Sequence, residues 1–211
     1  EIDQDVVRHI VEMLYTVGCE KRAGCPEPRI QRHEDHPAWQ SSSTGVYKTD
    51  FEPVLLAATA EYYRARVAGW LAECSCPRFV EEASRRLDSE ERRLDRYLHR
   101  SSEQELRAVV QREVILNTAR QLVEMDTGCQ AMFQNRRYDE LTLMYRLFRR
   151  EPSMLPHITA AMQPYIEERC AKTVGDPQMI EKPELFVKEV LELKAELDEM
   201  VARCFDNDSG F

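Results

Sequence analysis

The fold is indicated most clearly by residues 51–71, which read FEPVLLAATAEYYRARVAGWL. Apolar side chains recur there every three or four residues, which is the period of one face of an α-helix. Two more such stretches follow after short joints: residues 79–98 read FVEEASRRLDSEERRLDRYL, and residues 102–123 read SEQELRAVVQREVILNTARQLV. Each is long enough for about five or six helical turns. Because the joints are short, the three stretches predict long amphipathic helices that pack as antiparallel neighbours.

Most of the remaining chain is also predicted to be helical. Residues 2–17 carry an apolar stripe at helical spacing, with Asp3 placed as the N-cap and Gly18 as the stop. Residues 19–45 lose the period and are rich in Gly, Pro, Ser and His, so a long polar loop is expected there. No convincing strand pattern occurs, and the predicted fold class is all-α. Further helices are predicted over 129–134, 141–148, 152–170 and 183–205, with a loop over 174–182.

Local signals predict where individual helices begin and which side chains are buried. Pro53 suits the first turn of its helix. Ser102 followed by Glu105 has the spacing of a capping box, and Asp139 is expected to cap the helix over 141–148. One group of aromatic residues at helical spacing is interpreted as core rather than as an aromatic cage: Tyr62, Tyr63, Trp70 and Phe79.

Composition and charge narrow the classes of function. The net charge of -9 argues against a general nucleic-acid partner, which would need a basic surface. No apolar stretch approaches the ~20 residues that span a bilayer, and the acidic first residues do not form a secretory signal, so no membrane partner is expected. The seven scattered cysteines indicate a reducing compartment, the cytoplasm or the nucleus. One arginine group is interleaved with acidic residues and is interpreted as a solvated helix face: Arg85, Arg86, Arg92, Arg93 and Arg96.

The polar loop holds the one arrangement that invites a metal-site reading, namely Cys19, Cys25, His33 and His36. Five residues separate the cysteines and two separate the histidines, which is poor spacing for zinc. Residues that happen to share a polar loop explain the arrangement better. We therefore predict no metal site and no cofactor.

Other reactive residues also favour structural roles. Cys74-Ser75-Cys76 has one residue between the thiols and is interpreted as a helix junction rather than a redox motif. His99 ends a predicted helix, where a cation favours the helix dipole; His157 falls in the first turn of another helix, and His9 lies on a polar face. The chain has 7 glycines in 211 residues, too few and too scattered for a phosphate loop. These features indicate a scaffold rather than a catalyst, and no catalytic or cofactor-binding residue is predicted.

Several blocks of packing residues match a known pattern in order and spacing, although none is diagnostic alone. They are Val46-Tyr47-Lys48 with Phe51-Glu52, Arg86-Leu87 with Glu90-Glu91 and Tyr97-Leu98-His99, Asp139-Glu140-Leu141 with Met144-Tyr145-Arg146, Asp176-Pro177-Gln178-Met179, and Phe205-Asp206-Asn207-Asp208-Ser209-Gly210-Phe211. Over residues 45–211 the chain thereby resembles the N-terminal helical region of cullins, the scaffolds of multisubunit ubiquitin ligases. Within that family it is most similar to the cullin of SCF-type ligases. The loop over 19–45 and the choices after Val114 depart from the family pattern, which is typical of a distant or atypical cullin.

The resemblance implies an elongated stack of cullin repeats, each a five-helix unit, in a fragment of a longer chain. It divides the sequence into the end of a first repeat plus the polar loop (1–45), a second repeat (46–173), and a loop with the start of a third repeat (174–211). It implies a non-catalytic scaffold subunit of a cullin-RING ubiquitin ligase, a stalk between the substrate adaptor and the RING end in ubiquitin-dependent protein degradation. The implied partners are substrate-adaptor proteins and a RING-finger subunit, bound largely outside this chain, with a cullin-exchange or inhibitory factor as a further candidate. No site residue is carried over.

Two other interpretations stay open at this point. The first is another helical-repeat interaction scaffold, of the tethering or vesicle-trafficking type, which the lack of a C-terminal cullin homology domain in the full reading frame would favour. The second is an enzyme or metalloprotein centred on the Cys/His loop, which stoichiometric zinc that disappears on replacement of Cys25 would favour. Composition does not decide whether the loop is a docking site or an unstructured insertion.

Overall fold

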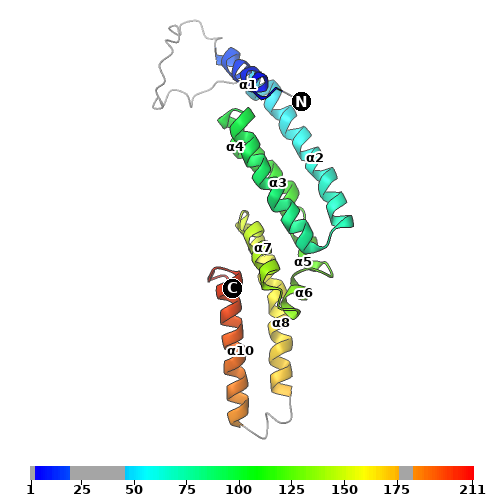
Figure 1. Cartoon of the computed structure of the whole chain (residues 1–211), viewed down its shortest axis with the longest axis vertical. Helices are drawn as coiled ribbons and strands as arrows, with labels where there is room; N and C mark the ends of the chain where they lie inside the picture. Colours follow the sequence, from blue (N-terminus) through cyan, green and yellow to red (C-terminus); the bar gives the residue numbers. More distant parts are fainter. Residues whose placement is uncertain (1–2, 20–45, 176–182) are drawn as a thin grey trace. The chain divides into compact units, whose positions relative to one another are not determined.

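The computed structural model describes residues 3–19, 46–175 and 183–211, which form helices joined by short turns and contain no strand (Figure 1). The all-α prediction is confirmed for these residues. The α-helices are α1 (Gln4–Cys19), α2 (Glu52–Glu73), α3 (Cys76–Tyr97), α4 (Glu103–Gln111), α5 (Ala119–Glu124), α6 (Cys129–Gln134), α7 (Tyr138–Phe148), α8 (Leu155–Gly175) and α10 (Pro183–Cys204). The π-helical turns η2 (Tyr47–Phe51) and η4 (Arg112–Leu116) and the 3₁₀ turns η3 (Arg100–Ser102) and η5 (Pro152–Met154) complete the order.

The chain divides into two compact units. The first unit contains the described residues up to Tyr63 together with Leu87–Val110, and the second contains Arg64–Arg86 and the described residues from Gln111 onward. The long helices α2 and α3 therefore contribute residues to both units. In the first unit, α1 packs against η2. No helix in the described part of the chain is long and apolar enough to cross a membrane.

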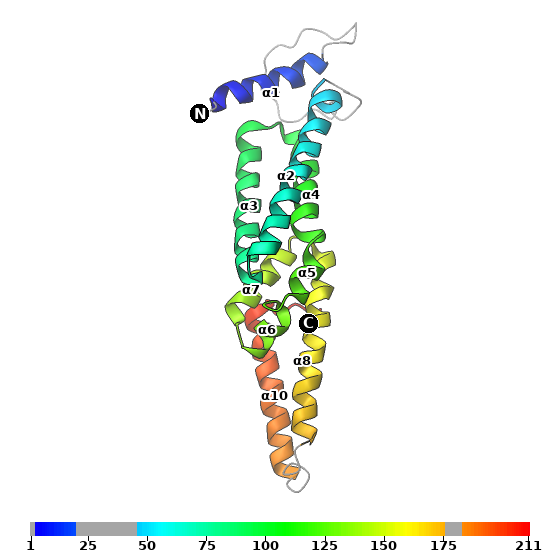
Figure 2. The same ribbon diagram turned by 90° about the vertical axis from the view of Figure 1, so that its right-hand side faces the viewer.

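The core of the second unit lies among α5, α6, α7, α8 and α10, which contact one another. Helices α8 and α10 run side by side in both views (Figures 1 and 2). Burial of large apolar side chains stabilises this arrangement, because fully burying one such side chain contributes roughly 1.5–3 kcal/mol of free energy. Members of this core that are fully buried are Ile115, Leu122, Phe133, Leu141, Phe148, Ile158 and Phe205.

Two of the predicted helix starts are confirmed. The Asp3 Oδ1 atom accepts a hydrogen bond from the Asp5 N–H at 3.0 Å, as expected of an N-cap. The helix it opens continues through Gly18 to Cys19, one residue past the predicted stop. Pro53 lies in the first turn of α2, although the helical path already begins with η2.

The prediction of one continuous helix over 102–123 is wrong. The helical path widens into the π-helical turn η4 after Gln111, where the Asn117 N–H donates to the Arg112 carbonyl at 3.0 Å. Thr118 then ends the regular pattern, because its hydroxyl donates to the Val114 carbonyl at 2.7 Å and competes with the backbone ladder. A new helix, α5, starts at Ala119.

Both side-chain caps predicted after residue 100 are also wrong. The Ser102 hydroxyl is buried and bonds to Tyr47 and Glu52 rather than to the start of its own helix. Asp139 lies inside the first turn of α7, whose N-cap is Arg137, and its carboxylate pairs with Arg203 at 3.2 Å. In each case a tertiary partner competes successfully for the side chain that the local pattern assigned to a cap.

The aromatic group interpreted as core is only partly buried. Tyr63 and Phe79 are 1% and 0% exposed, respectively, which confirms the prediction for these two residues. Trp70 is half-buried, with its ring edge-on to Phe79 at 5.9 Å between centroids. Tyr62 is 46% exposed, so its placement in the core was wrong.

Candidate functional site

A buried polar cluster connects η2 and the start of α2 to the turn before α4. We call these residues the joint cluster: Tyr47, Lys48, Glu52, Ser101 and Ser102. The Lys48 ammonium donates to Glu52 Oε1 at 2.6 Å and to the Ser101 carbonyl at 2.7 Å. The Ser102 hydroxyl lies 2.5 Å from Glu52 Oε1 and 2.7 Å from the Tyr47 hydroxyl.

The proton positions in the joint cluster follow from these distances. An ionised carboxylate can only accept, so the Ser102 hydroxyl must donate to Glu52. Ser102 has one hydroxyl proton, and it therefore accepts from the Tyr47 hydroxyl. Tyr47 and Ser102 are fully buried and Glu52 is 6% exposed. Each buried polar group has a partner, so the cluster fixes the geometry of the joint instead of offering free groups for chemistry.

His99 lies beside the joint cluster and packs on α1. Its ring stacks on Tyr15 with 3.6 Å between centroids and an angle of 17° between planes. Burial, followed by the neighbouring Lys48 ammonium, lowers the pKa of His99, although Glu12 and Glu52 oppose this shift. The interpretation of His99 as a dipole-stabilising cation is therefore wrong, because its surroundings favour the neutral ring.

The cysteine pair at the α2–α3 junction is structural, as predicted. Helix α2 ends at Glu73 and α3 begins at Cys76, whose backbone N–H donates to the Thr127 hydroxyl at 2.9 Å. Burial raises the pKa of the Cys76 thiol to about 12 and also raises the pKa of Cys129. Thiols that remain protonated near neutral pH are poor nucleophiles and poor metal ligands.

The described residues contain no group of three or more His, Cys, Asp or Glu side chains that could hold a metal ion. The Cys/His arrangement singled out in the sequence falls outside this statement, because Cys25, His33 and His36 lie beyond the described residues and the side chain of Cys19 is not described. His157 occupies the first turn of α8, as predicted. His9 is exposed on α1, as predicted for a polar face.

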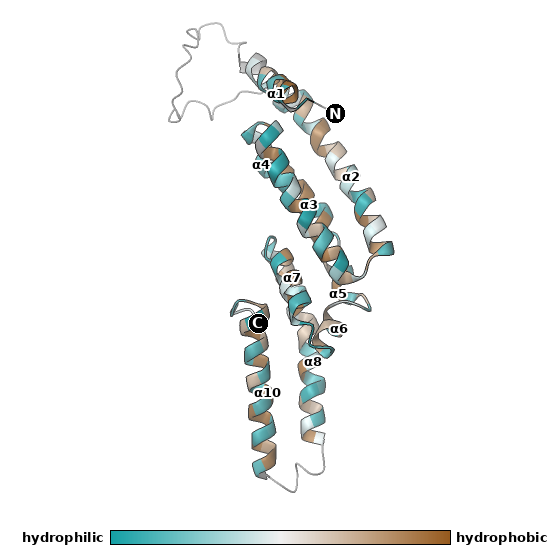
Figure 3. Cartoon of the chain, viewed as in Figure 1, coloured by the Kyte–Doolittle hydropathy of each residue, from teal (hydrophilic) through white to brown (hydrophobic). Residues whose placement is uncertain are grey.

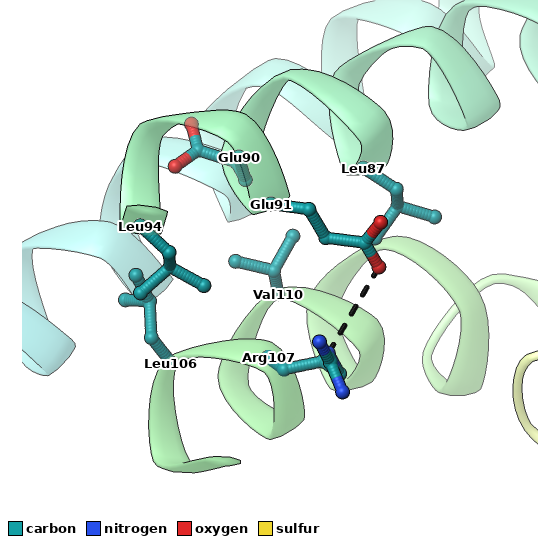
Figure 4. A pocket seen from close by; sticks show the side chains of 7 residues that line it. All are labelled: Leu87, Glu90, Glu91, Leu94, Leu106, Arg107 and Val110. Atoms are coloured by element: carbon teal, nitrogen blue, oxygen red, sulfur yellow. Dashed lines mark ion pairs between the residues drawn. The ribbon is translucent and has the colours of Figure 1, made fainter. Parts of the chain in front are cut away.

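A shallow groove in the first unit is lined by residues of α3 and α4 (Figure 4). Its enclosed volume is about 10 Å³, which is at the lower limit for a single water molecule. Glu91 and Arg107 reach toward each other across it, with Arg107 Nε and Glu91 Oε1 3.9 Å apart. The groove therefore has no room for a small-molecule ligand. Its lining residues are Leu87, Glu90, Glu91, Leu94, Leu106, Arg107 and Val110.

The outer face of α3 is mostly hydrophilic (Figure 3). Within one or two turns of the helix, Arg86 pairs with Glu82 at 2.8 Å and Arg93 pairs with Glu90 at 3.1 Å. Arg85 pairs with Glu82 as well. The structure thus confirms a solvated face with helical ion pairs, and each such pair contributes only a few tenths of a kcal/mol, roughly 0.2–0.5.

Two helices expose apolar side chains that are candidates for binding other surfaces. On α1, Val6, Ile10 and Met13 follow one another at helical spacing and are each about half exposed, while Val11 is buried. On α10 of the second unit, Val187 and Leu191 are 55% and 60% exposed. The sequence predicted an apolar stripe over residues 2–17 but not which of its side chains stay exposed.

Packed helices with apolar faces on α1 and α10 define the class as an all-α helical domain. A family model described as the cullin alpha solenoid domain matches residues 1–211. The chain belongs to the cullin family, which confirms the resemblance read from the sequence. The match does not favour the tethering or trafficking alternative.

Individual relatives agree with the family model. The chain is 32% identical to Cullin-3A of Arabidopsis thaliana over 167 residues, covering 79% of this chain and 23% of that protein. It is 27% identical to Cullin-3 of Dictyostelium discoideum over 211 residues, covering 100% of this chain and 25% of that protein. It is 28% identical to Cullin-1 of the same organism over 176 residues, covering 79% of this chain and 21% of that protein. The chain thus spans about a quarter of the length of the curated relatives it matches.

Proposed function

We propose that the chain is a segment of the scaffold subunit of a cullin-RING ubiquitin ligase, acting in ubiquitin-dependent protein degradation. The observation that carries this proposal is the match of the cullin alpha solenoid model to residues 1–211. The all-α architecture and the closely packed core of the second unit support it. In this proposal the segment is non-catalytic, and it contributes geometry rather than reactive groups.

The proposed mechanism is proximity. A rigid stalk holds the bound substrate and the charged conjugating enzyme at a fixed separation, which raises the effective concentration of the substrate lysine near the activated ubiquitin. The proposal includes an elongated stack of five-helix repeats, with the second repeat over 46–173. Packing between helices and fully bonded joints such as the joint cluster would supply the stiffness that this mechanism needs.

The proposed partners are substrate-adaptor proteins and a RING-finger subunit, bound largely outside this segment, and a cullin-exchange or inhibitory factor. Assignment to the SCF-type class within the family is part of the proposal. We also propose a location in the cytoplasm or the nucleus. The free thiols of the described residues support a reducing compartment.

The partners are tested by affinity purification of the tagged full-length protein from its native cell, followed by mass spectrometry. A RING-finger subunit and an adaptor in near-stoichiometric amounts are expected, and both should be missing from a parallel purification of an unrelated tagged helical protein. Recovery of a different helical assembly with neither subunit would overturn the assignment to ubiquitin ligases.

The geometric role is tested separately by breaking a helix of the stalk. Ala160 is exposed on α8, so Ala160→Pro interrupts the helix without removing a core side chain, and Ala160→Ser is the matched control. In the reconstituted ligase, the proline variant should slow ubiquitin transfer to adaptor-bound substrate while leaving formation of free ubiquitin chains at the RING end unchanged. Equal transfer by both variants would contradict the rigid-stalk mechanism.

A further inference from the structure

Helix α1 belongs to the first unit and contacts the rest of it through η2 and His99. One face of the His99 ring stacks on Tyr15, and its edge meets the Tyr47 ring with 6.1 Å between centroids. Tyr15 also meets the Tyr47 ring, at 6.0 Å. Among the α1 residues whose burial is described, Val11 is the buried one, and Val6, Ile10 and Met13 are exposed on the opposite side of the helix. The stack of His99 on Tyr15 and the two edge-to-face contacts with Tyr47 therefore help to hold α1 in place.

The hydrogen bonds of His99 fix its protonation state. The backbone N–H of Ser101 donates to His99 Nδ1 at 3.2 Å, so that nitrogen has to be unprotonated and the ring proton resides on Nε2. The Ser101 hydroxyl lies 2.9 Å from the same nitrogen. Protonating Nδ1 would place two N–H donors face to face, and the ring could keep its position only by losing the backbone bond.

The charged groups that act on His99 lie on η2, α1 and α2. Lys48 of η2 is anchored through Glu52 and the Ser101 carbonyl, so its ammonium cannot move away from an imidazolium without breaking those bonds. Glu12 of α1 and Glu52 of α2 attract an imidazolium, and Tyr15 and Tyr47 supply the rings. Burial and Lys48 outweigh the two carboxylates, and the pKa of His99 is lowered.

We propose that His99 is an acid-sensitive latch for α1. The neutral ring accepts the Ser101 N–H, stacks on Tyr15 and holds α1 against η2. The imidazolium loses the Ser101 bond and is repelled by Lys48, so the ring leaves the stack and α1 separates from the rest of the first unit. Separation uncovers Val11, which lies on the opposite side of α1 from the apolar residues that the docked helix already exposes.

The direction of the effect follows from linkage. A histidine whose pKa is lowered on folding binds fewer protons in the docked state than in the released state. Its contribution to docking is fully present above the ordinary histidine pKa of about 6.5 and is lost as the pH falls toward the lowered value. Acidification therefore opens the latch, and alkaline conditions keep it closed.

The test is amide hydrogen exchange of the full-length protein, read by mass spectrometry in peptides that cover Gln4–Cys19. After correction for intrinsic exchange rates, the protection of the α1 amides should fall by a factor of at least about three between about pH 7.5 and about pH 5. Peptides from α7 serve as the internal reference and should keep their protection, which separates release of α1 from global unfolding. Equal protection of α1 at the two pH values would overturn the proposal.

Two variants and one spectroscopic measurement complete the test. His99→Gln retains an amide oxygen that can accept the Ser101 N–H but does not titrate, so its α1 should show no pH response. Tyr15→Phe retains the stacked ring, so its α1 should respond as the wild type does. If His99→Gln responds to pH as the wild type does, the latch is refuted. If that variant does not fold, an NMR titration of wild-type His99 decides: a pKa at or above about 6.5 refutes the latch, and a lower one supports it.

Discussion

The joint cluster of the first unit and the core around α6 in the second unit hold helices together by different physical means. The joint cluster uses a chain of hydrogen bonds from Tyr47 through Ser102 to a buried carboxylate. The second core uses rings and sulfur atoms: Phe133 stacks on Tyr165, and Cys129 Sγ lies 3.0 Å from Met144 Sδ. Apolar burial contributes more free energy, whereas a fully bonded polar network selects one geometry. The joint cluster therefore selects the geometry of the first unit, and the apolar core supplies most of the stability of the second.

The largest effect is expected from breaking the second core. Phe133→Ala should lower the free energy of unfolding by about 3–5 kcal/mol, because the 0%-exposed ring leaves a cavity that its aromatic neighbours cannot fill. The exposed ring of Tyr62 is the matched control, and Tyr62→Ala should change the same quantity by less than about 1 kcal/mol. Urea unfolding followed by circular dichroism measures both. A loss below about 2 kcal/mol for Phe133→Ala would mean that the core is not the main source of stability.

A smaller loss is expected from breaking the joint cluster. Glu52→Leu leaves the buried Ser102 hydroxyl without its acceptor and the Lys48 ammonium without its counter-charge, although the bond from Lys48 to the Ser101 carbonyl remains. This should cost about 2–3 kcal/mol, since the Lys48 side chain is 29% exposed and regains some water. The double variant Lys48→Met with Glu52→Leu should recover part of this loss, because the ammonium that lacks its counter-charge is gone. A double-mutant cycle in urea gives the coupling. Purely additive losses would show that the two residues do not act as a pair.

A still smaller effect distinguishes the joint cluster from a local cap. Ser102→Ala should cost about 1–2 kcal/mol, because the Tyr47 hydroxyl loses its buried acceptor. Glu105→Ala should stay within about 0.5 kcal/mol, since Glu105 is exposed and makes no capping-box bond to Ser102. Comparable losses for the two variants, together with coupling between them, would restore the capping-box interpretation.

The sequence predicted the helices of this fold well because their periodic apolar pattern is a local property. It did not predict the turn at Arg112–Leu116, whose backbone follows a bond between residues five apart and a back-bonding Thr118. It also assigned Ser102 and Asp139 to caps, although partners 50 and 64 positions away in the sequence, respectively, compete for these side chains. Sequence spacing carries no information about such tertiary competitors.

The exposed apolar face of α1 and the state of His99 could be predicted only in part from the sequence. The apolar stripe on α1 was visible in the sequence. The side of the helix that is covered depends on where His99 and Tyr47 lie in the folded protein, and the sequence does not show this. The interpretation of His99 as a cation failed for the same reason. A histidine at a helix end favours the charged form by dipole alone, and only the structure shows that burial and Lys48 reverse this preference.

The smallest expected effect concerns the turn after α10, where a polar contact is added to the apolar core. The Tyr145 hydroxyl donates to Asp208 Oδ2 at 3.0 Å, and the Gly210 N–H donates to Oδ1 at 2.9 Å. The Gly210 bond, and then the Tyr145 bond, hold the pKa of Asp208 below its ordinary value of 3.8.

A carboxyl group with a lowered folded pKa stabilises the protein above its unfolded pKa, and this contribution disappears as the pH falls through the folded value. The difference in thermal midpoint between wild type and Tyr145→Phe should therefore be present near neutral pH and shrink as the pH falls below about 4. A difference that stays constant down to that pH would mean that Tyr145 acts through its ring, which lies edge-to-face against Phe205. The second unit would then depend on apolar packing at this turn as well.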